Sequence, residues 1–171
     1  MNETRQQILA HVKSNPGVHF NGIVRDIDIA TGQAQYHLRR LIKGGELEDE
    51  SINGRTHYFS PEFDPWERRA LALLRRETSR NVIALGLRDG SVPAPAVADE
   101  LDVARSTVTW HLSNLEEAGI VRTDYGPDGK LSYEIVDPAR TRDLLGMVTP
   151  SLSDQLIDRF GILLDRALNP E

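Results

Sequence analysis

Side chains able to hydrogen-bond base edges or phosphates are concentrated in residues 31–43. They are Thr31, Gln33, Gln35, Tyr36, Arg39, Arg40 and Lys43. Glutamine can pair bidentately with adenine, and arginine with guanine or with a phosphate. The stretch holds three basic residues and no acidic one. These residue types favour contact with the major groove of duplex DNA over the alternative, a charged helix face that is merely solvated.

The same stretch has the periodicity of a helix. Its apolar residues recur at intervals of three and four: Ala34, Leu38, Leu41 and Ile42. They are expected to face a core and to leave the polar side chains outward. Thr31 is a suitable N-cap, and Gly44-Gly45 is a suitable stop.

This segment returns 74 residues later, where residues 110–115 (WHLSNL) repeat residues 36–41 (YHLRRL). The same offset relates Ile27 to Leu101 and Gly45 to Gly119. Such self-similarity indicates one structural unit that occurs twice.

The second copy of the helix is polar but nearly uncharged. Its outward candidates for DNA contact are Arg105, Ser106, Thr107, Thr109, Trp110 and Asn114. The inward residues are Val108, Leu112 and Leu115. Glu116 and Glu117 at its end would repel phosphates if that end approached DNA. This copy therefore either contacts DNA or serves as a structural or partner-binding element.

Each copy has the element order of a winged helix-turn-helix domain. In the first, a helix capped by Thr4 and a short helix over residues 20–27 precede the polar helix. Strands at 46–50 and 56–60 then flank Asn53-Gly54, a strong hairpin signal, with Arg55 at the tip. The second copy starts at a helix capped by Ser79 and ends in a hairpin that turns at 126–129, beside Lys130.

We predict a mainly α fold with small β wings, which is α+β. The predicted segments are an N-terminal winged helix-turn-helix domain (1–62), a linker helix (63–78), a second such domain (79–137) and a C-terminal helical segment (138–171). The last segment carries an apolar stripe at helical spacing: Leu152, Leu156, Phe160, Leu163 and Ala167. This stripe either folds back on the second domain or forms a helix pair in a homodimer.

Composition limits the function classes. The chain has 171 residues and a net charge of −6, which argues against a non-specific nucleic-acid coat. Residues 1–60 hold seven basic and seven acidic residues, so the acidic excess lies in the remainder and the first domain is electrostatically better suited to DNA. The absence of Cys excludes disulfides and thiolate metal sites. No apolar run could cross a bilayer, and the N-terminus does not resemble a signal peptide, so we expect a cytoplasmic protein.

The histidines do not form a recognisable metal motif. His37 and His111 occupy equivalent positions, which favours a repeated structural or phosphate-facing hydrogen bond. His11, His19 and His57 are expected to be unrelated surface residues. Phosphate loops, nucleophile elbows and paired catalytic carboxylates are also missing, so we expect no catalysis, no cofactor and no metal.

Residues 105–112 (RSTVTWHL) and 115–121 (LEEAGIV) resemble the recognition helix and the start of the wing in ArsR and MarR winged-helix repressors. Residues 32–41 match the same pattern, and two such units joined by a helix resemble the tandem winged-helix transcriptional regulators common in archaea. The resemblance covers residues 4–137. It implies a regulator, expected to be a repressor, that binds double-stranded DNA sequence-specifically. Metal-sensing relatives use Cys or His clusters that this chain lacks.

Two alternatives remain open. Tandem winged helices also serve as protein-interaction adaptors in chromosome and transcription complexes, and the acidic balance suits a protein partner. In a third hypothesis the first domain binds DNA, while the second domain and the aromatic linker around Trp66 form a pocket for a small effector.

Overall fold

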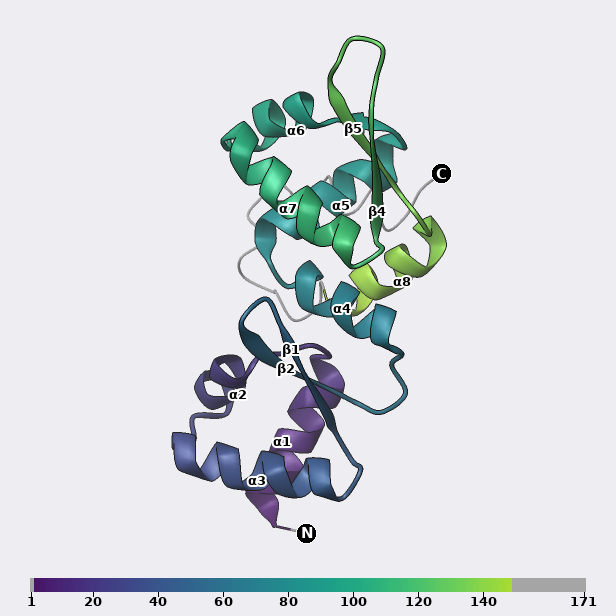
Figure 1. The fold of residues 1–171 in the computed structure, drawn as a ribbon. Helices are drawn as coiled ribbons and strands as arrows, with labels where there is room; N and C mark the ends of the chain where they lie inside the picture. Colours follow the sequence, from purple (N-terminus) through teal and green to yellow (C-terminus); the bar gives the residue numbers. More distant parts are fainter. Residues whose placement is uncertain (1, 149–171) are drawn as a thin grey trace. The chain divides into compact units, whose positions relative to one another are not determined.

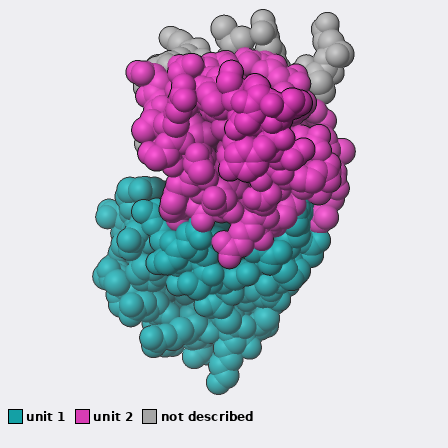
Figure 2. Space-filling view, turned by 45° about the horizontal axis from the view of Figure 1, so that its top comes forward, with its two compact units in different colours: residues 1–72 teal, residues 73–171 magenta. Residues whose placement is uncertain are grey.

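The computed structural model describes residues 2–148 (Figure 1). Two compact units divide the chain, residues 1–72 and 73–171 (Figure 2). This division falls inside the predicted linker 63–78. Both units combine helices with a small antiparallel sheet, which confirms the α+β class and the tandem winged helix-turn-helix arrangement.

Unit 1 consists of three helices, a hairpin and most of a fourth helix, whose last two residues fall in unit 2. The elements are α1 (Glu3–Ser14), α2 (Phe20–Ile27), α3 (Thr31–Lys43), β1 (Glu48–Ile52), β2 (Arg55–Phe59) and α4 (Pro65–Leu74). Helix α1 packs against α2 and α3. Ile8, Ile23, Leu38 and Leu41 meet in the core and are nearly inaccessible to water, so burial of their apolar surface anchors one face of α3.

The hairpin of unit 1 turns at Asn53-Gly54, as predicted. Both residues have positive φ, 50° and 78°, and Ile52 pairs with Arg55 across the turn. Such a two-residue turn matches the right-handed twist of the flanking strands. The strands thus extend to the turn itself and bring Arg55 to its edge.

Unit 2 repeats this order and adds a third strand and a last helix. Its elements are α5 (Glu77–Asp89), β3 (Val92–Pro93), α6 (Ala94–Leu101), α7 (Arg105–Glu117), β4 (Val121–Tyr125), β5 (Leu131–Ile135) and α8 (Pro138–Val148). The strand order is β3-β5-β4. The sequence did not predict β3, because a strand of two residues has too little length for an alternating pattern.

The structure confirms the repeat at the level of single residues. Helices α2 and α6 span 20–27 and 94–101, and α3 and α7 span 31–43 and 105–117, so the offset of 74 holds at every end. Asp28 and Asp102, which close α2 and α6, share the left-handed conformation at φ 56° and 54°.

Three predicted helix caps were wrong. Asn2 caps α1 in place of Thr4, and its side chain accepts a hydrogen bond from the Arg5 amide. Ala30 occupies the N-cap of α3, so that Thr31 is the first helical residue. Helix α1 begins two residues earlier than predicted because Asn2 is itself a preferred N-cap residue. Helix α3 begins one residue earlier than predicted and has no side-chain cap, so it does not depend on a capping side chain.

The third cap affects the linker. Helix α5 begins at Glu77 with Arg76 as its N-cap, and Ser79 is buried within the helix. A single linker helix reaching Glu77 is therefore also incorrect, because α4 ends at Leu74. None of the helices within residues 2–148 is long and apolar enough to span a bilayer. The predicted stripe from Leu152 to Ala167 lies outside the described residues.

Candidate nucleic-acid interface

Helix α3 divides into a core face and an exposed face. Ala34, Leu38 and Leu41 are buried, and Ile42 is half-buried. All seven predicted contact residues of this helix are exposed: Thr31, Gln33, Gln35, Tyr36, Arg39, Arg40 and Lys43. Because the buried face fixes the helix, the exposed donors are held at the surface of unit 1.

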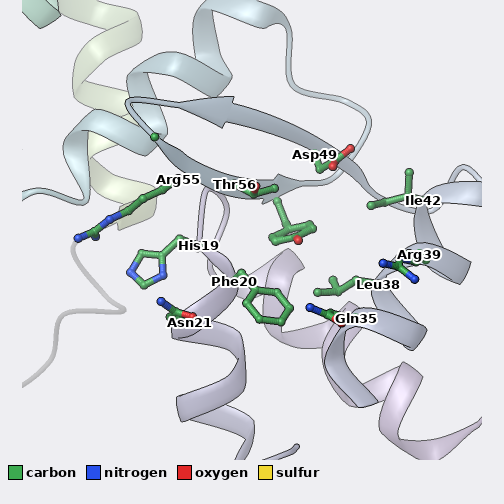
Figure 3. Close-up of a pocket in the computed structure, with 12 residues that line it drawn as sticks. His19, Phe20, Asn21, Gln35, Leu38, Arg39, Ile42, Asp49, Arg55 and Thr56 are labelled. Atoms are coloured by element: carbon green, nitrogen blue, oxygen red, sulfur yellow. The ribbon is translucent and has the colours of Figure 1, made fainter. Parts of the chain in front are cut away.

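A groove of about 450 Å³ runs between α3, the start of α2 and the hairpin (Figure 3). Gln35 and Arg39 line it from α3, and Arg55 lines it from the hairpin. Asn21 contributes from α2, and Asp49 is the acidic residue of the lining. The groove thus gathers two guanidinium groups and two amides, donors that suit an anionic phosphodiester chain.

The exposed Tyr36 ring belongs to a small stack on α3. The guanidinium carbon of Arg40 lies 5.8 Å from its centroid, and the His37 ring meets it edge-on at 5.1 Å. His37 is only 5% exposed. Burial and the nearby Arg5 and Arg40 charges lower the pKa of His37, which keeps its ring neutral. The hydrogen bond predicted for His37 is not observed within residues 2–148, where its Nδ1 atom has no partner.

The second recognition helix, α7, is anchored in the same way. Val108, Leu112 and Leu115 are buried, whereas Arg105, Ser106, Thr109 and Trp110 are exposed. Two predicted contact residues, Thr107 and Asn114, are only half-exposed. The Asn114 Nδ2 atom is buried and has no hydrogen-bond partner within residues 2–148. The helical spacing that predicted an outward Asn114 therefore did not predict how far neighbouring residues cover this side chain.

Unit 2 has a smaller groove in the corresponding place, of about 240 Å³. Arg105 and Thr109 line it from α7, Lys130 lines it from the hairpin tip, and Ala94 and Pro95 line it from the start of α6. Three predicted contact residues, separated in sequence, are thus brought together. In both units a recognition helix and a hairpin each supply a cation to one groove.

Glu116 stays exposed at the end of α7, and its carboxylate is held in place by the wing. Its carboxylate accepts hydrogen bonds from the backbone N–H of Thr123, at 3.1 Å, and from the Thr123 hydroxyl, at 2.7 Å. The contact ties the end of α7 to β4. In the same wing, Arg122 forms an ion pair with Glu134, so part of its charge is neutralised within the sheet.

Comparisons with known proteins agree with this geometry. A family model described as an N-terminal HTH domain matches residues 2–71, and one described as a helix-turn-helix domain matches residues 77–124. The chain carries two helix-turn-helix domains in tandem.

A relative with a similar sequence comes from Methanocaldococcus jannaschii. It is an uncharacterized HTH-type transcriptional regulator, 26% identical to this chain over 125 residues. The match covers 72% of this chain and 31% of the relative, so the chain spans less than a third of that protein's length. The assignment to the ArsR or MarR type stays a prediction.

A polar contact joins the recognition helix of unit 2 to the first helix of that unit. In unit 2, Ser79 on α5 lies 2.8 Å from His111 Nδ1. Burial and the charge of Arg76 lower the pKa of His111. In unit 1 the residue equivalent to Ser79 is Arg5. Within residues 2–148, neither its buried Nε atom nor the buried His37 Nδ1 atom has a hydrogen-bond partner, so unit 1 lacks this contact. The Ser79–His111 contact could not be predicted from the sequence, because the two residues belong to different helices.

The remaining histidines are structural, which corrects the prediction that they are unrelated surface residues. His19 Nδ1 accepts a hydrogen bond from the Gly22 amide and so caps α2. His57, 3% exposed, donates from Nδ1 to the Gly17 carbonyl at 2.6 Å. His11 lies 3.3 Å from an Asp26 oxygen. Because histidine is not among the preferred N-cap residues, sequence reasoning could not identify this cap.

Proposed function

We propose that the protein is a transcriptional regulator that binds duplex DNA sequence-specifically. The observation that carries the proposal is the exposed face of α3, with its basic and amide side chains beside the groove that Gln35, Arg39 and Arg55 line. A recognition helix requires an anchored inner face and outward donors for a major groove about 12 Å wide. Helix α3 fulfils both requirements.

The grooves suggest a division of contacts. Outward residues in the first half of α3, Gln33 and Tyr36 among them, would contact base edges. The groove between helix and hairpin would follow the sugar-phosphate backbone, with Arg39 and Arg55 on phosphates. Unit 2 would contribute through Arg105, Ser106, Thr109, Trp110 and Lys130, with Thr107 and Asn114 only partly available.

A regulator of this kind would repress by occupying a promoter and blocking polymerase, as the resemblance to ArsR and MarR repressors implies. A homodimer through the C-terminal segment 138–171 would present four recognition helices. Its operator would be palindromic, with half-sites about one helical turn or more apart. No effector is assigned.

Fluorescence anisotropy on promoter fragments of the same genome tests the proposal. The full chain is titrated across a salt series and in excess competitor duplex. Salt-dependent binding that survives competitor on a subset of fragments supports a sequence-specific regulator. Absence of binding at every salt concentration, together with a stoichiometric protein partner in a pull-down free of nucleic acid, would instead support the adaptor hypothesis.

A further inference from the structure

Both recognition helices expose an aromatic ring at the same position of the repeat. Tyr36 on α3 corresponds to Trp110 on α7, and the two residues are 54% and 52% exposed. The basic residues of the same stretch are not repeated. Arg39, Arg40 and Lys43 correspond to Ser113, Asn114 and Glu117. An exposed aromatic ring is therefore a feature that the two recognition helices share, whereas their charge is not.

Each ring is positioned by the histidine that follows it. The His37 ring meets Tyr36 edge-on, with 5.1 Å between centroids, and the His111 ring meets Trp110 edge-on at 4.8 Å. His37 is buried, and His111 Nδ1 lies 2.8 Å from the Ser79 hydroxyl oxygen, so both imidazoles are held by their own unit. Edge-to-face contact is a favoured arrangement of aromatic rings. Rings that are positioned before binding lose little side-chain freedom when a ligand arrives.

Both rings stay accessible despite their neighbours. Their exposed fractions already allow for the guanidinium carbons of Arg40 and Arg76, which lie 5.8 Å from the ring centroids. One turn before Tyr36, a Cβ at Gly32 would enter open space. Each ring also lies in the first half of its helix, the part of a recognition helix that contacts base edges.

The chemistry that the two side chains share is apolar. A tyrosine hydroxyl can donate and accept hydrogen bonds, whereas the tryptophan N–H only donates, so the two residues do not offer a common hydrogen-bonding pattern. They do have a flat apolar ring in common. Among the donors and acceptors of the major groove, base pairs present one apolar group, the C5-methyl of thymine.

We propose that Tyr36 and Trp110 are specificity-determining residues that contact thymine methyl groups in the major groove, one in each unit. The proposal rests on the proposed function and deepens it, since it names a feature of the bases that both helices recognise. Helix α7 carries Arg105 against Glu116 and Glu117. Contact with a methyl group gives this weakly charged helix a role in recognition that does not depend on charge.

Replacing thymidine by deoxyuridine tests the proposal, because it removes the methyl group and keeps the base pairing. A promoter fragment that the full chain binds is prepared in both forms and titrated by fluorescence anisotropy. The wild-type chain should bind the deoxyuridine form more weakly, by about fourfold for each methyl contact, the factor that corresponds to one buried CH₂ group. Tyr36→Ala and Trp110→Ala should each reduce the affinity ratio between the two forms, and the double variant should reduce it most.

Two further variants serve as controls. Tyr36→Phe keeps the ring and removes the hydroxyl, so it should retain the wild-type affinity ratio. Tyr125→Ala is the matched control, because it removes a ring that is 71% exposed at the end of β4, outside the recognition helices. It should also retain the ratio. Circular dichroism and a thermal melt establish that each variant is folded.

Equal binding of both DNA forms by the wild-type chain, or an unchanged ratio in the double variant, would overturn the inference. Specific binding by the wild-type chain would then leave the proposed function intact. An unchanged ratio in one single alanine variant would overturn the inference for that unit. A ratio that falls as far in Tyr36→Phe as in Tyr36→Ala would assign the contact to the hydroxyl and overturn the methyl contact of unit 1. A wild-type chain that binds no duplex would refute the proposed function itself.

Discussion

Replacing Arg39 by Ala should separate DNA recognition from folding. Arg39 is exposed, and its side chain lines the groove opposite the hairpin. Within residues 2–148, the Arg39 side chain makes no hydrogen bond or ion pair. Removal should therefore change the free energy of unfolding by less than about 0.5 kcal/mol, as at ordinary surface positions.

The same change should cost considerably more in binding. A bidentate contact to a base contributes about 1–3 kcal/mol, which corresponds to a loss of roughly 5- to 150-fold in affinity. A phosphate contact would instead lower the salt slope by about 0.9 for all sequences. Arg39 and Arg55 line the same groove. We therefore expect Arg39 to contact a phosphate, and Arg39→Ala to lower the salt slope for all duplex sequences.

Anisotropy titrations at several salt concentrations, on a bound promoter fragment and on a scrambled duplex, distinguish these outcomes. Lys13→Ala on α1 is a suitable control, because it also removes one exposed cation from unit 1 but does not line the groove. If Arg39→Ala and Arg40→Ala both bind like the wild type, the assignment of α3 as a recognition helix is wrong.

Two further predictions concern stability. The buried Tyr133 hydroxyl donates to the Val82 carbonyl at 2.7 Å. Tyr133→Phe leaves that acceptor without its partner and should lower the free energy of unfolding, measured by urea titration, by about 1–3 kcal/mol. An unchanged urea midpoint would contradict the importance of this bond. The pKa values of His37 and His111 are lowered in the folded state, so the unfolded chain binds more protons as the pH falls through the ordinary histidine value near 6.5. The free energy of unfolding should therefore decline from pH 7 toward pH 5. The double variant His37→Gln, His111→Gln should show a smaller decline. An equally steep decline in the double variant would mean that other groups cause it.

Local signals predicted most of the elements that form the surface. The alternation of apolar and polar residues identified the buried and exposed faces of α3 and α7, because 3.6 residues per turn place such positions on opposite sides. Asn53-Gly54 predicted the hairpin turn, because it tolerates positive φ. Helix starts were less predictable, as Thr4, Thr31 and Ser79 illustrate, since a capping side chain contributes only about 1 kcal/mol and packing can override it.

The sequence by itself determined that one unit occurs twice and which helix of each unit presents donors. These properties depend on neighbours a few residues apart, whose spacing dictates a helix, a turn or a strand. Only the tertiary structure decided which charges act together. It brought Arg55 beside Arg39, placed Arg76 over Trp110, and bound Glu116 to Thr123. Such contacts join residues from different elements, and only packing of the apolar faces specifies how those elements meet.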